Sequence, residues 1–268
     1  MTLIGRRRVA PTTVQVIPVA ETPHSIAASH DGTRLYVTHF RSGSVSAIDV
    51  AAGTVTAKYA VQPGLYGVTE HPDGKRIYVA NPSSQFVEMI DSADGSVQIS
   101  AGVGAKCYGL AIGRDGGALY AAAALDDTVL VLDSLVMNRT TIEGVDFPVG
   151  LAMSPSGDRL YATNYFSESV TVIDPRAAAG DESQSAVIAK IPVPPGPYGI
   201  AVHPDGDRIY VAHFHSEDVV SVLDSATLAV LDTMAVGHGM VRGVAVSPDG
   251  SRLYVTNYFA GSVSVIDL

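Results

Sequence analysis

Six copies of one short pattern recur along the 268 residues, and this repetition constrains the fold more than any other feature. Each copy is a polar turn, usually containing Asp-Gly, followed by an apolar run around a tyrosine. These tyrosines, spaced 42, 42, 41, 49 and 44 residues apart, are Tyr36, Tyr78, Tyr120, Tyr161, Tyr210 and Tyr254. A regular period of this length is typical of proteins built from repeated supersecondary units.

Each repeat contains four segments with the signature of a short β-strand. In the fifth repeat these are the apolar or alternating runs at 199–202, 208–212, 219–224 and 228–236, separated by turn residues. No useful length of the chain shows the 3.6-residue apolar period of a helix. Four antiparallel strands in about 42 residues are typical of a propeller blade. We therefore expect an all-β, single-domain, six-bladed β-propeller spanning 1–268.

The two ends of the chain predict how the ring closes. The sixth repeat stops after its third strand signal, at residues 262–268, whereas the other repeats continue into a fourth. Residues 12–19 have the pattern of that missing strand and precede the first repeat. We expect residues 12–19 to complete the last blade, which would cover two otherwise open sheet edges.

Variants of the string Tyr-Val-Thr-Asn occur at 36–39, 78–81, 161–164, 210–213 and 254–257, with Ser-Pro-Asp-Gly at 247–250 and Ser-Val-Ser-Val-Ile-Asp at 262–267. These strings resemble the repeat of the YVTN family of β-propellers over nearly the whole chain. The resemblance implies a propeller fold. It implies little about function, because this architecture carries surface-layer proteins, binding scaffolds and a few enzymes such as the streptogramin lyases.

Charge and composition exclude several classes of partner. The chain has 17 Lys and Arg against 27 Asp and Glu, a net charge of −10, which disfavours nucleic acid and anionic membrane as partners. A single cysteine, Cys107, excludes a disulfide framework and a cysteine-only zinc site. The sequence shows no export segment and no long apolar run, so we expect a cytoplasmic protein, most simply a monomer.

One end of the channel carries a varied set of side chains. The first residue of each innermost strand should lie at this mouth, and the six positions are His24, Tyr66, Tyr108, Val149, Tyr198 and Arg242. Phenol, imidazole and guanidinium groups suit the binding of a small polar or aromatic molecule. The alternative is a water-filled channel with an ordinary polar lining.

The same face should carry the ends of the second strands and the loops beside them. Because the sixth repeat borders the first, five histidines should gather on one side of this face: His24, His39, His213, His215 and His238. Neutral imidazoles can bind a divalent metal ion or act as general acids and bases. The sequence therefore offers candidate ligands for one divalent metal ion: His24, His39, His213 and His215.

Two functions remain open from the sequence. The first is a lyase-, isomerase- or cyclase-type enzyme acting at the channel mouth, with His24, His39 and His213 as catalytic groups. Substrate would then be bound by Tyr66, Tyr108, Tyr198, Arg242, Asn164, Asn257 and His238. The second is a non-catalytic binding or scaffold propeller for a peptide or protein. An enzyme predicts that the histidines converge with Arg242; a scaffold predicts that they spread around an open rim.

Overall fold

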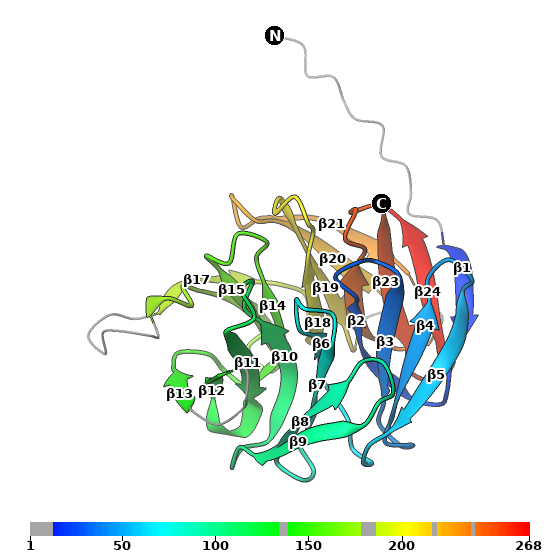
Figure 1. Cartoon of the computed structure of the whole chain (residues 1–268). Coiled ribbons are helices and arrows are strands. Elements are labelled where there is room, and N and C mark those ends of the chain that lie inside the picture. The colour runs from blue at the N-terminus through cyan, green and yellow to red at the C-terminus, as the bar shows by residue number, and fades with distance from the viewer. Residues whose placement is uncertain (1–12, 134–138, 178–185, 216–218, 237–238) are drawn as a thin grey trace.

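Six four-stranded antiparallel sheets form a ring, with the first strand of each sheet innermost (Figure 1). This computed structural model describes residues 13–133, 139–177, 186–215, 219–236 and 239–268. The six-bladed propeller predicted from the repeats is confirmed. Each of the first five blades is one continuous stretch of chain whose strands run outward in order, and the sixth blade combines both ends of the chain.

The strands occupy equivalent places in every blade. The innermost strands are β2 (Pro23–Ala28), β6 (Val68–Glu70), β10 (Cys107–Ile112), β14 (Pro148–Met153), β18 (Pro197–Val202) and β22 (Val241–Val246). The second strands are β3 (Arg34–His39), β7 (Arg76–Asn81), β11 (Ala118–Ala123), β15 (Leu160–Asn164), β19 (Arg208–His213) and β23 (Arg252–Asn257). The third strands are β4 (Ser44–Asp49), β8 (Phe86–Asp91), β12 (Thr128–Asp133), β16 (Ser169–Ile173), β20 (Val219–Asp224) and β24 (Ser262–Asp267). The outer strands are β5 (Thr54–Ala60), β9 (Val97–Gly102), β13 (Arg139–Ile142), β17 (Val187–Pro192), β21 (Val230–Ala235) and β1 (Thr13–Pro18).

Strand β1 closes the ring, as the sequence predicted for residues 12–19. It pairs antiparallel with β24, with Thr13 opposite Ile266 and Pro18 opposite Ser262 (Figure 1). Ile17 is 1% exposed and belongs to the apolar cluster between the last and first blades. Residue 12 lies outside the described residues.

The core consists of apolar layers between neighbouring blades. The repeated tyrosines of the second strands supply much of it. Tyr254 of the sixth blade, for example, packs with Ile26 and Leu35 of the first. Burying a large apolar side chain contributes on the order of 1.5–3 kcal/mol to stability. Every blade therefore depends on its neighbours.

Glycines allow the innermost strands to approach each other closely. A Cβ added to Gly199 would lie 2.3 Å from the carbonyl oxygen of Arg242 in the next blade, and one at Gly150 would lie 2.1 Å from that of Tyr198. Equivalent contacts occur at Gly67, Gly109 and Gly243. Each of these glycines directly follows a mouth residue, so the close approach fixes the backbone on which the mouth side chains stand.

Helical structure is nearly absent, as expected. Within the described ranges helical residues are confined to the 3-10 turn η1 (Ala124–Asp126) and to residue 177. No helix there is long and apolar enough to cross a membrane.

The closure yields a prediction about truncation. Removing residues 1–18 exposes the edge of β24 and the surface that Ile17 covers, so it should lower the free energy of unfolding by at least about 3 kcal/mol and promote self-association. Removing residues 1–12 keeps β1 and serves as the control. Chemical denaturation and light scattering of both proteins measure this, and equal stability of the two would contradict the role of β1.

The glycine contacts yield a second prediction. Gly199→Ala places a methyl group against a backbone carbonyl and should destabilise the fold by about 3 kcal/mol or more. Gly102→Ala is the matched control, because its Cβ would make an ordinary 3.6 Å contact with the Phe86 ring. Thermal unfolding of the two variants compares them. A Gly199→Ala protein as stable as Gly102→Ala would show that the blades can move apart.

Candidate functional site

β-Bulges set the direction of the mouth side chains. The register between the first and second strands shifts in five blades, between Pro23 and Ile26, for example, and between Val241 and Val244. Those bulges contain His24, Tyr108, Val149, Tyr198 and Arg242. A bulge redirects the side chain of its extra residue. The repeated irregularity thus presents one residue per blade at the mouth, while Tyr66 precedes the short β6.

The structure brings five of the six predicted mouth residues into one continuous cluster. The ring of His24 lies 4.0 Å from that of Tyr66 and 5.4 Å from that of Tyr198, measured between centroids. Tyr66 in turn contacts Tyr108 at 4.8 Å. The sixth residue, Val149, is buried and apolar.

Three polar groups of this cluster form a closed hydrogen-bonded triangle. Arg242 Nη1 donates to His24 Nε2 at 2.8 Å and to the Tyr198 hydroxyl at 3.1 Å. The Tyr198 hydroxyl also lies 3.0 Å from His24 Nε2. A guanidinium only donates, so Nε2 accepts and the imidazole proton lies on Nδ1. The triangle therefore requires a neutral His24.

The electrostatics of the mouth agree with this assignment. Burial lowers the pKa of His24 well below its usual value, and the positive charge of Arg242 lowers it further. Burial also raises the pKa of the Tyr198 phenol above its usual value. At neutral pH both groups are uncharged, and Arg242 is the charged member of the triangle.

Arg242 lies among aromatic rings and is not balanced by a carboxylate. Its guanidinium carbon is 4.2 Å from the ring centroid of Tyr258, 4.3 Å from Phe214 and 5.0 Å from Tyr198. In the part of the chain that the structure describes, Arg242 makes no ion pair, and its buried Nε has no hydrogen-bond partner. No described carboxylate therefore neutralises the charge of Arg242.

A second tier of aromatic residues, which the sequence reasoning missed, surrounds the mouth. Each follows the last residue of a second strand, and they are Phe40, Tyr165, Phe214 and Tyr258. The second and third blades have Pro82 and Ala124 at this place. The recurring pairs His-Phe and Asn-Tyr at the strand ends were the available signal. This tier makes the mouth asymmetric, with its rings over the first, fourth, fifth and sixth blades.

The expectation that the second-strand ends face the ligand is wrong. His39 and His213 are fully buried inside their blades. His39 Nε2 bonds to the Ser46 hydroxyl at 2.8 Å and its Nδ1 lies 3.3 Å from the Glu21 carbonyl oxygen. His213 makes the same two contacts with Ser221 and Pro195. Both imidazoles bridge strands of one blade, so their alanine variants should affect the fold.

Asn164 and Asn257 occupy the same structural position. Asn257 Nδ2 donates to the hydroxyls of Ser262 at 3.0 Å and Ser264 at 2.9 Å. Asn164 bonds in the same way to Ser169 and Thr171. Both side chains are fully buried. The prediction that they face the channel mouth is therefore wrong.

The four histidines predicted as metal ligands do not come together. His24 belongs to the mouth triangle, His39 and His213 lie inside separate blades, and exposed His215 bonds to the Tyr165 hydroxyl at 2.5 Å. His238 lies outside the described residues. Among the described residues, no three His, Cys, Asp or Glu side chains form a group that could hold a metal ion.

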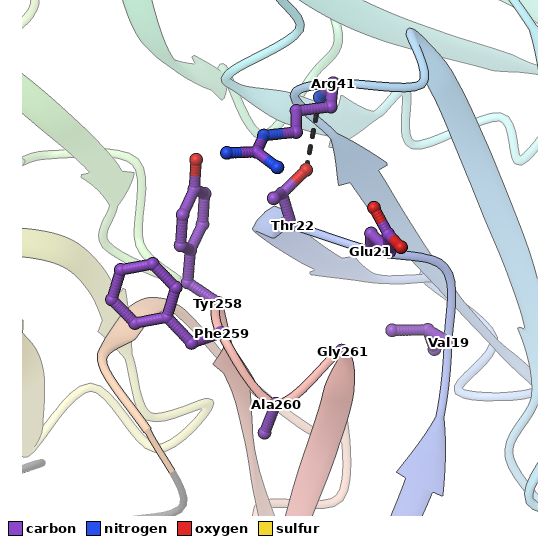
Figure 2. A pocket seen from close by; sticks show the side chains of 8 residues that line it. All are labelled: Val19, Glu21, Thr22, Arg41, Tyr258, Phe259, Ala260 and Gly261. Atoms are coloured by element: carbon purple, nitrogen blue, oxygen red, sulfur yellow. Dashed lines mark hydrogen bonds between the residues drawn. The ribbon is translucent and has the colours of Figure 1, made fainter.

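A pocket of about 430 Å³ opens beside the mouth, at the seam between the last and first blades (Figure 2). Its lining consists of Val19, Glu21, Thr22, Arg41, Tyr258, Phe259, Ala260 and Gly261. Tyr258 also contacts Arg242, so this ring separates the pocket from the mouth cluster.

Comparisons with known proteins support the fold and leave the family open. No family model matches the chain, and no curated protein matches it. A chain of Kuenenia stuttgartiensis hydrazine synthase is 22% identical with a TM-score of 0.73, over 100% of this chain and 99% of that one. The β-propeller domain of Myceliophteria thermophila Cps50 (Swd1) is 11% identical with a TM-score of 0.75, over 96% and 99%. At these identities the similarity shows the six-bladed propeller fold alone.

The buried position of His39 yields a pH prediction. Burial lowers its pKa to about 4, so the unfolded chain takes up the proton first, and the folded state loses stability as pH falls below about 6.5. In His39→Asn the amide can contact Ser44 and Ser46 as Asn257 contacts Ser262 and Ser264, without titrating. The stability of this variant relative to the natural protein should rise by about 2 kcal/mol between pH 7.5 and pH 5.

Chemical denaturation at the two pH values measures this difference. His39→Ala, which leaves a cavity and unpaired groups, should be destabilised by about 2 kcal/mol even at pH 7.5. A pH-independent difference between the Asn variant and the natural protein would show that folding does not lower the pKa of His39.

Proposed function

We propose that this propeller binds a small anionic molecule at the channel mouth, with Arg242 as the group that holds the anion. The observation that carries the proposal is a guanidinium among three aromatic rings, with no carboxylate partner among the described residues. Charged hydrogen bonds of a guanidinium to a carboxylate or phosphate are among the strongest available to a protein. A net charge of −10 attracts anions poorly at long range, so recognition would depend on this local geometry.

The surroundings of Arg242 favour a ligand with a planar or aromatic part. Tyr198, Phe214 and Tyr258 offer ring surface next to the cation, and Tyr66 packs on the neighbouring His24. Aromatic walls with a few fixed polar groups are typical of small-molecule sites. An aromatic carboxylate satisfies both requirements: its charged group on Arg242 and the Tyr198 hydroxyl, and its ring against the tyrosines.

His24 is the one predicted catalytic histidine that remains a candidate. Arg242 occupies its Nε2 lone pair and helps to keep its pKa low. An anion that draws the guanidinium away would free Nε2 and raise the pKa of His24, which could then accept a proton from the ligand. This arrangement supports lyase- or isomerase-type chemistry through His24 as a narrower form of the proposal.

A binding role toward a protein partner is the second candidate function. Phe166 and Phe259 stand at equivalent places, two residues beyond the second strands, and are 67% and 70% exposed. Large exposed aromatic side chains are typical of interaction sites. This role does not need the charge of Arg242.

We also propose that the chain belongs to the YVTN family of β-propellers. The support is the recurring Tyr-Val-Thr-Asn variants and the Ser-Pro-Asp-Gly string.

Benzoate and its neutral isostere benzamide test the anion proposal. Benzoate should stabilise the protein against heat by mass action, and benzamide should not. Arg242→Gln should weaken benzoate binding by about tenfold or more. Arg252→Gln, which removes a cation near the opposite face, is the matched control and should leave binding unchanged.

Calorimetry in buffers of different ionisation enthalpy tests His24. Binding of benzoate near neutral pH should be accompanied by proton uptake, which His24→Gln should abolish. Equal binding of benzoate and benzamide, or full benzoate binding by a folded Arg242→Gln protein, would overturn the anion proposal. Benzoate binding without proton uptake would overturn the role of His24 alone.

A further inference from the structure

The seam pocket exists because the ring closes between its two ends. One wall is the connection from β1 to β2, residues 19–22, and the other is the turn between β23 and β24, residues 258–261. The backbone N–H of Val19 donates to the carbonyl of Gly261 at 2.9 Å, which joins the two walls. A volume of about 430 Å³ is sufficient for a molecule of amino-acid size.

The pocket contains one positive and one negative side chain that do not neutralise each other. Neither Arg41 nor Glu21 forms an ion pair with a described residue. Figure 2 shows the reason: the guanidinium of Arg41 is turned toward Tyr258 and away from Glu21. Both charges therefore remain available to a ligand.

The backbone that carries Arg41 is held in place. The N–H of Arg41 donates to the hydroxyl of Thr22 at 3.1 Å (Figure 2). The N–H of Phe40 donates to the carbonyl of Thr22 at 3.2 Å. Thr22 itself is 7% exposed. The two charged residues thus stand on a connection and a turn that are bonded to each other, which reduces the entropic cost of ordering them around a ligand.

Apolar groups complete the lining. Tyr258 and Phe259 present aromatic surface, and Val19 lies on the opposite wall (Figure 2). Phe259 is 70% exposed, although its backbone N–H is bonded to the carbonyl of Gly239 at 3.2 Å. An exposed ring on a fixed backbone can cover the apolar part of a ligand.

We propose that the seam pocket binds a zwitterionic α-amino acid with an aromatic or large apolar side chain. The carboxylate accepts hydrogen bonds from the guanidinium of Arg41, and the ammonium group donates to the carboxylate of Glu21. The side chain packs against Tyr258 and Phe259. Opposite charges that share a cavity without pairing fit a ligand that carries both, whereas a ligand with one charge leaves the other unsatisfied. The proposal does not depend on anion binding at the channel mouth.

Three probes that differ in one charge each test this site by calorimetry on the Arg242→Gln protein, in which the anion-binding group of the mouth is removed. L-phenylalanine carries both charges, 3-phenylpropanoate lacks the ammonium group, and L-phenylalaninamide lacks the carboxylate. L-phenylalanine should bind about tenfold or more tightly than either analogue. Equal affinity for all three, or no binding of L-phenylalanine in the millimolar range, would overturn the proposal.

Two exposed variants assign the charges. Glu21→Gln should weaken L-phenylalanine binding by about tenfold and leave 3-phenylpropanoate unchanged. Arg41→Gln should weaken L-phenylalanine equally and leave L-phenylalaninamide unchanged. Arg252→Gln, which removes a cation that lines neither site, is the matched control and should retain L-phenylalanine binding. Unchanged L-phenylalanine binding in both seam variants, or its loss on Arg242→Gln alone, would place the ligand elsewhere.

Discussion

The close approach of the innermost strands is the constraint on which the rest of this structure depends. Gly199 and Gly150 leave no room for a Cβ, because the carbonyl oxygen of the next blade's mouth residue occupies that space. The same contact that packs one blade against the next therefore fixes the backbone of Arg242 and of Tyr198. A mouth side chain on so rigid a backbone can be held in a hydrogen-bonded triangle without a separate supporting structure. Fold and site share one set of contacts.

The Tyr-Val-Thr-Asn string is explained by these contacts. The tyrosine fills the layer between blades, as Tyr254 does against Ile26. The threonine joins blades through its hydroxyl: Thr163 Oγ1 accepts from the N–H of Gly150 at 2.8 Å and donates to the carbonyl of Tyr198 at 2.6 Å. Thr38 and Thr256 bond in the same way to Tyr66 and His24. In four blades the final Asn or His bonds to the third strand of its own blade. In the second blade, Asn81 bonds instead to the Pro63 carbonyl and to the N–H of Ser83. Each letter of the motif satisfies a packing or hydrogen-bonding need, so the motif itself carries no information about a ligand.

This explains which parts of the site could be predicted from the sequence. The blades, the closure by β1 and the mouth positions follow from periodicity, because a repeat places equivalent residues at equivalent points. The prediction for His39 and His213 is wrong because a strand that ends on the mouth face can still direct its last side chain into its own blade. The serines to which they bond, Ser46 and Ser221, belong to the same blades, and the third blade has the apolar residues Ala123 and Leu130 at the equivalent positions. Variation at that position reflects pairing within a blade. The triangle with Arg242 depends on side-chain directions that no pattern of letters specifies.

Apart from these structural positions, the differences between blades are concentrated around the closure of the ring. Aromatic residues of the second tier stand over the fourth, fifth, sixth and first blades, and Arg242 and His24 belong to the last two of these. The seam pocket lies at the same junction, and Tyr258 belongs both to its lining and to the aromatic rings around Arg242. Packing does not require this bias, because the second and third blades fold equally well with Pro82 and Ala124 at the corresponding places. A movement of the Tyr258 ring would alter the seam pocket and the surroundings of Arg242 together. The two proposed sites therefore share one wall, the Tyr258 ring.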